Sequence, residues 1–390
     1  MTPLKVFLVA GELSGDKLGQ ALMAGLKALA GAVEFRGVGG PGMAAEGLSS
    51  LFPMDELSVM GLAEVLPKLR HLFRRRDEVV RAVLDWQPDV LVTIDSPDFS
   101  LRVAKKVKAA SRIRTVHYVA PSVWAWRPGR ADKMARHIDH VLALLPFEPP
   151  YMQAAGMDCD FVGHPVVSEP VATAAEAQGF RARHRIDGEI LLILPGSRRG
   201  EVTRLADRFG DTLGLLLENR PGLQAVIPAA APVAEMLAGL VADWPGDPLL
   251  LDPRSFSANG FAAEKRAAFR AADAALAASG TVSLELAATG TPMVIGYDLS
   301  WVSRQIVLGL LRVDTFTLVN LVSETRAVPE FIGDACRSAP MAEAVAALLD
   351  APEQQRAALD LTMERLGRGG EAPGLRAARA VLAGLGVTSA

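Results

Sequence analysis

A short apolar run in the middle of the chain constrains the fold more than any other segment. Residues 191–194 (Leu-Leu-Ile-Leu) are uninterrupted apolar residues, which is typical of a strand buried on both faces of a parallel sheet. The run ends in Pro195-Gly196-Ser197. Apolar residues then recur at helical spacing, at Val202, Leu205, Phe209, Leu213 and Leu216. The segment therefore predicts a strand, a turn and a helix of an α/β protein.

The turn after this strand carries groups that bind anions. In an open α/β sheet, ligands bind outside the carboxyl ends of the strands, which is where Ser197 and Arg198 would lie. A serine hydroxyl, free amides at a helix start and a guanidinium together make an anion site. A structural turn with solvated arginines would show the same pattern. A second turn of this kind, Ser279-Gly280-Thr281, favours the binding site.

Length and composition set the class of protein. A chain of 390 residues exceeds one typical core, so we expect two domains. The net charge of −3 does not favour a nucleic-acid partner. Cys159 and Cys336 lie far apart without metal-type spacing, which indicates a reducing compartment. The apolar run 6–10 is too short for a signal peptide, and no stretch reaches the roughly 18 apolar residues of a membrane span. We therefore expect a cytoplasmic protein.

Two glycine-rich turns follow the first strands of the chain. A strand is predicted over residues 5–10, and Glu12 and Ser14 lie in the turn after it. This turn lacks the Gly-Lys-Ser/Thr ending of a nucleotide-hydrolysing loop, so we exclude one. The run 37–42 (Gly-Val-Gly-Gly-Pro-Gly) fits a dinucleotide glycine pattern. Because it follows the second strand, it is weak evidence for NAD.

Polar and aromatic side chains follow two further predicted strands. Asp95 and Asp98 come directly after the strand predicted over 89–94, where one carboxylate could cap the next helix and the other could act as a base. The loop after the strand predicted over 115–119 carries Ser122, Trp124, Trp126, Arg127 and Arg130. The tryptophans could pack between helices. The other interpretation is a platform for a sugar or an acyl chain, with cations for a phosphate.

A basic segment combines apolar and cationic residues. Its candidate membrane contacts are Met60, Leu66, Leu72, Phe73, Arg74, Arg75 and Arg76. A charge run is usually a solvated helical face. The adjoining apolar surface makes a membrane-surface element the rival interpretation.

The second half repeats the pattern of strand, turn and helix. Gly163-His164-Pro165 indicates a hinge, in which His164 is either structural or catalytic. Glu285 falls one helical turn after Thr281 and so faces the same side, where a carboxylate suits two ribose hydroxyls. Asn320 supplies a polar group that we expect near the same site.

Five ordered motifs together resemble those of one enzyme family. They are residues 10–16, 94–99, 121–126 and 194–198, and residues 279–281 with Glu285. This set is similar to that of the lipid-A-disaccharide synthases and spans nearly the whole chain. The resemblance implies a GT-B glycosyltransferase with two Rossmann-like domains that face a cleft. It implies domains over 1–165 (acceptor and lipid side) and 166–350 (UDP-sugar side), with C-terminal helices over 351–390 that pack back on the first domain.

The resemblance also implies a reaction and its partners. UDP-2,3-diacylglucosamine would react with 2,3-diacylglucosamine 1-phosphate to give the β-1',6-linked lipid A disaccharide 1-phosphate and UDP. An inverting transfer needs one base, for which Asp95 is the candidate, with Asp98 as the alternative and Glu12 lining the acceptor side. Arg198 and the amides around Thr281 would neutralise the departing UDP without a metal or another cofactor.

The remaining expected roles follow the same division. The nucleotide side would comprise Ser197, Arg198, Ser279, Gly280, Thr281, Glu285 and Asn320, and the acceptor side Ser14, Ser122, Trp124, Trp126, Arg127 and Arg130. The protein would attach peripherally to the inner membrane and could form a homodimer. A UDP-sugar epimerase and a non-catalytic lipid-binding module stay open as alternatives.

Overall fold

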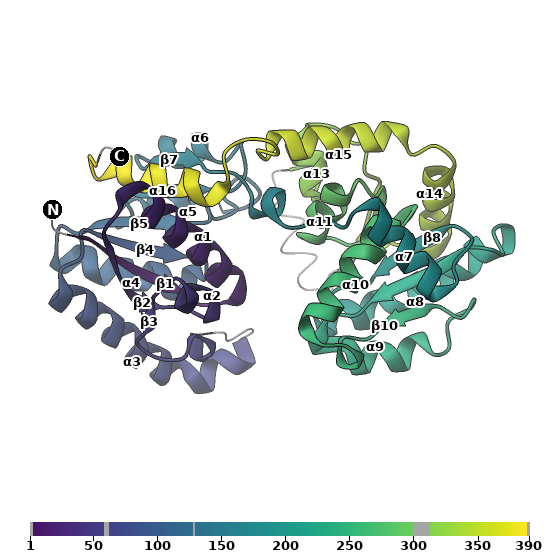
Figure 1. Cartoon of the computed structure of the whole chain (residues 1–390), viewed down its shortest axis with the longest axis horizontal. Helices are drawn as coiled ribbons and strands as arrows, with labels where there is room; N and C mark the ends of the chain where they lie inside the picture. Colours follow the sequence, from purple (N-terminus) through teal and green to yellow (C-terminus); the bar gives the residue numbers. More distant parts are fainter. Residues whose placement is uncertain (1–2, 58–61, 128, 299–312, 388–390) are drawn as a thin grey trace. The chain divides into compact units, whose positions relative to one another are not determined.

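The chain forms two compact units. The computed structural model describes residues 3–57, 62–127, 129–298 and 313–387, with residues 62–68 described by their backbone alone. Unit 1 comprises Met1–Ser168 and Gly369–Ala390, and unit 2 comprises Glu169–Arg368 (Figure 1). The α/β class predicted from the sequence is confirmed, because each unit is built on one parallel sheet.

Unit 1 is organised around a seven-stranded parallel sheet of order β3-β2-β1-β4-β5-β6-β7. Its strands are β1 Leu4–Ala10, β2 Val33–Val38, β3 Ser49–Ser50, β4 Val90–Ile94, β5 Arg114–Tyr118, β6 His140–Ala143 and β7 Asp158–Phe161. Its helices are α1 Leu13–Ala30, α2 Pro41–Ala45, α3 Leu62–Trp86, α4 Pro97–Ala110, α5 Gly129–Met134, α6 Pro149–Ala154 and α16 Pro373–Gly384. The strands at the centre are continuous apolar runs because both of their faces are covered by helices.

The last helix of the chain belongs to the core of unit 1. Helix α16 packs along α1, and the two backbones approach closely at Gly25 and Gly374 (Figure 1). A Cβ atom at Gly25 would lie 2.6 Å from the carbonyl oxygen of Gly374. Ala377, Ala378 and Val381 are buried against this contact. The C-terminus is thereby tied to the first strand–helix pair.

Unit 2 contains a six-stranded parallel sheet of order β10-β9-β8-β11-β12-β13. Its strands are β8 Ile190–Leu194, β9 Gln224–Pro228, β10 Leu249–Leu251, β11 Ala274–Ala278, β12 Met293–Tyr297 and β13 Glu330–Ile332. Its helices are α7 Ala174–His184, α8 Arg199–Asn219, α9 Ala234–Val241, α10 Ala258–Ala271, α11 Val282–Thr289, α13 Leu318–Ser323, α14 Ser338–Asp350 and α15 Glu353–Arg365. The core lies between the sheet and α8 and α14, around Phe209 and Met341.

Of the two helices after residue 350, only α16 packs on unit 1. Helix α15 packs on α11 and α13 of unit 2, where the Gln355 side chain donates to the backbone carbonyls of Met293 and Ala327. The polypeptide therefore leaves unit 2 after residue 368, later than the sequence suggested. No helix in the described parts of either unit is both long and apolar enough to cross a bilayer.

Each sheet has one point at which the strand order reverses. In unit 1 this point lies between β1 and β4, and in unit 2 between β8 and β11. The register pairs Ala10 with Ile94 and Leu194 with Ala277, so the turns that follow these strands leave each sheet side by side. Ligands of open α/β sheets bind at such topological switch points. The sequence motifs therefore lie where the topology favours ligand binding.

Candidate functional site

The switch point of unit 1 brings two polar turns into close approach. Gly11 and Glu12 follow β1, and Asp95 and Ser96 follow β4. A Cβ atom at Gly11 would lie 2.6 Å from the Ser96 hydroxyl oxygen, so only glycine allows this approach without a shift. Glu12 is the N-cap residue of α1 and is half-buried. The structure thus brings together the turns that carry Glu12 and Asp95, two residues 83 positions apart in the sequence.

Asp95 sits on a strained backbone. Asp95 and Ser96 both adopt left-handed conformations, with φ of 50° and 43°. Non-glycine residues rarely adopt this region, and such strain concentrates at functional sites. The Asp95 amide donates to the carbonyl of Tyr118 (3.0 Å), which holds the turn against β5. No described residue hydrogen-bonds to the half-buried Asp95 carboxylate, so it is available to a ligand.

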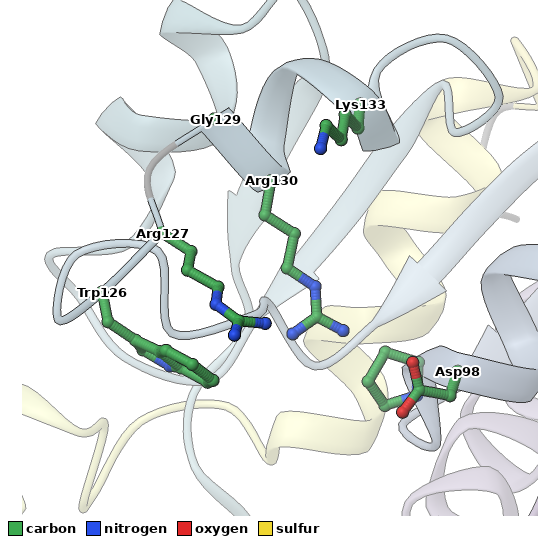
Figure 2. A pocket seen from close by; sticks show the side chains of 7 residues that line it. Asp98, Trp126, Arg127, Gly129, Arg130 and Lys133 are labelled. Carbon is green, nitrogen blue, oxygen red and sulfur yellow. The ribbon is translucent and has the colours of Figure 1, made fainter. Parts of the chain in front are cut away.

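Asp98 faces a cavity of about 590 Å³ formed by the residues after β4 and β5. Trp126, Arg127, Arg130 and Lys133 line the opposite wall, and Figure 2 shows the guanidinium groups of Arg127 and Arg130 pointing into the same space. The Arg127 guanidinium stacks over the Trp126 ring, 4.4 Å from its centroid. Lys133 was missed in the sequence, although it lies three residues after Arg130 and so on the same face of α5.

Trp124 turns away from this cavity and anchors the loop. Its ring packs edge-on against Phe147 at 5.1 Å, and its indole N–H donates to the Glu148 carboxylate at 3.4 Å. The Glu148 carboxylate also accepts the amides of Leu144 (3.2 Å) and Leu145 (3.0 Å). Burial raises the pKa of Glu148 to about 7, although these three donors act in the opposite direction. The ring and the indole N–H of Trp124 both contact residues of unit 1, which favours the packing interpretation; its place on the acceptor side stays a prediction.

The two serines expected on the acceptor side remain candidates by position alone. Ser14 is exposed in the first turn of α1, close to Glu12. Ser122 is exposed, and its carbonyl accepts the amides of Ala125 and Trp126, which shapes the loop below the cavity. Neither side chain lines the cavity.

In unit 2 the expected free amides at the start of α8 are occupied. The Glu201 carboxylate accepts the amides of Ser197 (3.2 Å) and Arg198 (3.3 Å) and pairs with the Arg198 guanidinium at 3.0 Å. Gly196 adopts a φ of 118° and leaves room for this carboxylate, because a Cβ atom there would lie 2.7 Å from Glu201. The prediction of free amides is therefore wrong for this state. Arg198 stays 65% exposed, so its guanidinium can still reach an anion.

The turn after β11 supplies the second half of this switch point. Gly280 and Thr281 are exposed and Ser279 is half-buried, and α11 begins directly after them. The Thr281 side chain makes no capping hydrogen bond to the helix. Glu285 lies one turn further, where its carboxylate pairs with Lys265 of α10 at 2.7 Å. Both side chains are only about one-third exposed, which fixes the Glu285 carboxylate beside the turn.

The Asn320 side chain is buried and hydrogen-bonded within unit 2. It is only 1% exposed, donates to Thr315 (3.2 Å) and to the carbonyl of Val328 (2.9 Å), and accepts the Val328 amide at 3.0 Å. Both N–H donors of the amide are therefore used, and its oxygen accepts one hydrogen bond. The expected place of Asn320 near the nucleotide stays a prediction, and the side chain donates to groups of unit 2 itself. It joins the segment before α13 to the residues that enter β13.

The amides at the end of the glycine run 37–42 are bound by a carboxylate of the protein itself. Asp16 is buried and accepts the amides of Gly40 (2.8 Å), Gly42 (2.8 Å) and Met43 (3.0 Å). These are the amides that a pyrophosphate would need. The weak indication of a dinucleotide site is thus explained by a structural turn.

Two histidines, the half-buried His164 and the buried His117, make hydrogen bonds within unit 1. His164 accepts the Val166 amide through Nδ1 at 3.2 Å, and burial lowers the pKa of His164 to about 4. His117 pairs with Thr93 at 2.8 Å, and burial, followed by the nearby Arg130 charge, lowers the pKa of His117 to about 4. Both are neutral near pH 7.

Most of the basic segment on α3 is paired rather than free. Arg75 forms a bidentate pair with Glu56 (2.7 and 2.8 Å) and also binds Glu78, and Arg76 pairs with Asp77. Leu72 packs against the core of unit 1. Arg74 and Phe73 are exposed, the latter by 39%. Met60 and the Leu66 side chain lie outside the described residues. The membrane candidates that remain visible are therefore Phe73 and Arg74.

The described residues contain no group of three or more His, Cys, Asp or Glu side chains that could hold a metal ion.

Comparison with known proteins identifies the family. Residues 6–372 match the sequence profile of the family described as lipid-A-disaccharide synthetase. A lipid-A-disaccharide synthase from Ruegeria pomeroyi is 62% identical over 97% of this chain and 95% of its own length. One from Rhodospirillum centenum is 49% identical, with coverages of 98% and 95%.

Solved structures show the same fold at low sequence identity. A UDP-GlcNAc 2-epimerase from Neisseria meningitidis, bound to UDP-GlcNAc, aligns with a TM-score of 0.61 at 12% identity, over 98% of this chain and 99% of that one. MurG from Acinetobacter baumannii aligns with a TM-score of 0.53 at 14% identity, over 97% and 95%. The fold is GT-B, as expected. On the sequence matches, the chain belongs to the lipid-A-disaccharide synthase family of glycosyltransferases.

Proposed function

We propose that the protein transfers 2,3-diacylglucosamine from UDP-2,3-diacylglucosamine to 2,3-diacylglucosamine 1-phosphate. The products would be the β-1',6-linked disaccharide 1-phosphate and UDP. One observation supports this most: the switch point of unit 1 presents the Asp95 carboxylate, to which no described residue hydrogen-bonds, whereas that of unit 2 presents the exposed Arg198 beside two glycine turns. A transferase needs both, a base for the acceptor and positive charge for the leaving diphosphate.

Unit 1 would bind the acceptor, with Asp95 as the base. An acceptor hydroxyl attacks the anomeric carbon as its proton passes to a carboxylate, and the glycosidic bond to UDP breaks. The Asp95 carboxylate is half-buried and has no described partner, so accepting a proton breaks no existing hydrogen bond. Asp98 is more exposed and lies beside the cations of the neighbouring cavity. Glu12 would line the acceptor side of the same switch point.

Unit 2 would bind the UDP portion of the donor. The Arg198 guanidinium and the amides after β11 would offset the negative charge that develops on the leaving diphosphate. Glu201 would have to release at least part of its hold on the Ser197 and Arg198 amides when the diphosphate binds. Its two amide hydrogen bonds, at 3.2 and 3.3 Å, are long, which makes such an exchange inexpensive. Glu285 would hold the ribose with the oxygen that Lys265 leaves free.

The enzyme would work at a membrane surface, because both proposed substrates carry acyl chains. Peripheral attachment at the cytoplasmic face of the inner membrane is the expected arrangement, and a homodimer is compatible with it. Phe73 and Arg74 are the described residues that would contribute to the attachment.

A UDP-sugar epimerase is the alternative that the fold allows. Epimerases with solved structures share the fold at 12–14% identity, whereas the synthases share 62% and 49% of the sequence. We therefore favour the synthase. The two activities differ in a simple assay: the synthase forms disaccharide and UDP in equal amounts only when both lipid sugars are present, and does so in EDTA. Conversion of the UDP-sugar to an epimer without an acceptor would instead support the alternative.

A further inference from the structure

The cavity below Trp126 carries an unbalanced positive charge. Arg127, Arg130 and Lys133 line it together with one carboxylate, Asp98, which leaves two formal positive charges. None of these three cations forms a salt bridge with a described residue. On α3, by contrast, Arg75 and Arg76 are both paired with carboxylates of unit 1 itself. Cations that are gathered in a cavity and left unpaired indicate an anionic ligand.

The two arginines are held in place before any ligand arrives. Arg127 has a left-handed backbone (φ 51°), and its guanidinium stacks on the Trp126 ring at 4.4 Å. Arg130 is half-buried, and its charge is close enough to the buried His117 of β5 to lower the pKa of that histidine. The Arg130 guanidinium therefore lies at the same edge of the sheet as the turn that carries Asp95. Stacked and partly buried arginines lose little conformational entropy on binding.

The arrangement of charges suits a sugar phosphate. Figure 2 shows the two guanidinium groups on one side of the cavity and Asp98 on the other, with the Trp126 ring beside them. A phosphomonoester carries a charge of about −1.5 to −2 near pH 7, close to the two positive charges left over in the cavity. Two guanidinium forks match its oxygens, an aromatic face suits a sugar ring, and a carboxylate accepts sugar hydroxyls.

We infer that this cavity is the subsite for the phosphomonoester of the acceptor, with Arg127 and Arg130 binding the phosphate and Lys133 adding charge. Trp126 lies against the sugar, and Asp98 accepts a sugar hydroxyl. The inference rests on the proposed function and extends it, because it assigns the group by which the enzyme selects a phosphorylated acceptor over a neutral one. It also separates the roles of the two aspartates, since Asp98 contacts the acceptor and Asp95 takes the proton.

The test compares two acceptors that differ only in the phosphate. The specificity constant kcat/KM is measured for the wild type with 2,3-diacylglucosamine 1-phosphate and with its dephosphorylated form, in detergent micelles. The same pair is then measured for Arg127→Ala and Arg130→Ala. Each variant should lose about 10- to 100-fold with the phosphorylated acceptor and change little with the other, because the lost contact exists only with the phosphate. Arg130→Lys should recover part of the loss.

Matched controls separate this subsite from general electrostatics. Arg136 is an exposed arginine of the neighbouring basic cavity, and Arg136→Ala should leave both specificity constants near the wild-type values. Asp98→Asn should slow both acceptors by the same factor, since its proposed partner is a hydroxyl. Inhibition by UDP should be unchanged in all five variants. Thermal unfolding shows whether each variant is folded. If Arg130→Ala does not fold, Arg127→Ala still tests the subsite, because Arg127 is exposed.

The possible results distinguish the phosphate subsite from the proposed function. Selective loss with the phosphorylated acceptor supports the subsite. Equal losses with both acceptors, or a wild type that does not distinguish them, would overturn it while leaving the synthase intact. Absence of any disaccharide from the wild type would instead refute the proposed function.

Discussion

A Cβ atom on Gly11 would lie 2.6 Å from the hydroxyl oxygen of Ser96 and 3.0 Å from its Cβ. This approach joins the turn after β1, which carries Glu12, to the turn after β4, which carries Asp95. The position of the proposed base Asp95 therefore depends on a glycine, Gly11, in the neighbouring turn.

Gly11→Ala should reduce disaccharide formation because the added methyl group displaces Ser96 and, with it, Asp95. Overpacking of this kind also costs about 1–3 kcal/mol in the free energy of unfolding. Ser96→Gly in the same chain should restore activity, since it removes the clashing atoms at a position whose φ of 43° favours glycine. Thermal unfolding and steady-state rates measure both effects. If the double variant stays as slow as Gly11→Ala, the loss arises from some other contact.

Arg198→Ala should weaken UDP binding and slow transfer by roughly 2–4 kcal/mol, the scale for losing one charge-stabilising donor. Its guanidinium is 65% exposed and its one ion pair among the described residues is with Glu201, so the fold should not suffer. Arg199→Ala removes the same charge one residue further and should have a smaller effect. Isothermal titration with UDP and steady-state rates give both quantities. Equal effects of the two variants would point to net charge rather than to a positioned donor.

The buried Glu148 should make stability fall as pH rises. Its pKa is raised to about 7 in the folded protein, against 4.5 in the unfolded chain. Between these values the folded state holds a proton that the unfolded state has lost, so the free energy of unfolding decreases by an amount on the order of 3 kcal/mol. Glu148→Gln removes this slope. The contributions of His117 and His164, which run the other way, cancel in the difference between the two proteins. Urea unfolding of both proteins from pH 4.5 to 8 measures the free energy of unfolding. The same pH dependence in the wild type and in Glu148→Gln would contradict this account.

Membrane attachment should depend on exposed rather than paired cations. Arg70 and Arg74 are exposed and one turn apart on α3, so R70E/R74E should release the protein from anionic vesicles, at about 1 kcal/mol for each charge lost. Arg75→Glu should instead lower the unfolding temperature, because it places a third carboxylate beside Glu56 and Glu78. Vesicle co-sedimentation at low salt measures the first effect. Unaltered sedimentation of R70E/R74E would leave α3 as a solvated helix.

Much of this arrangement could be predicted from the sequence because it depends on local patterns. The apolar runs before Asp95 and Ser197 predicted the strands to within about one residue, and parallel-sheet topology then placed the turns at one edge. One failure came from a contact that no spacing reveals, because Arg75 meets Glu56 across 19 positions. Glu201, in contrast, caps its own helix start three residues after Arg198, a spacing that could have indicated the occupied amides. Asn320 looks available in the sequence, yet it is buried by residues on both sides of it.

The central claim is that Asp95, and not Asp98, removes the acceptor proton. The most direct test is the rate of disaccharide formation by Asp95→Asn, measured beside Asp98→Asn and the wild type at saturating substrates. Loss of a positioned base predicts a decrease of roughly 100-fold or more for Asp95→Asn, with UDP affinity near that of the wild type because the residue belongs to unit 1. Asp98→Asn should keep most of the maximal rate once acceptor saturates. Substantial turnover by a folded Asp95→Asn protein, with loss in Asp98→Asn, would contradict the account and move the base to Asp98.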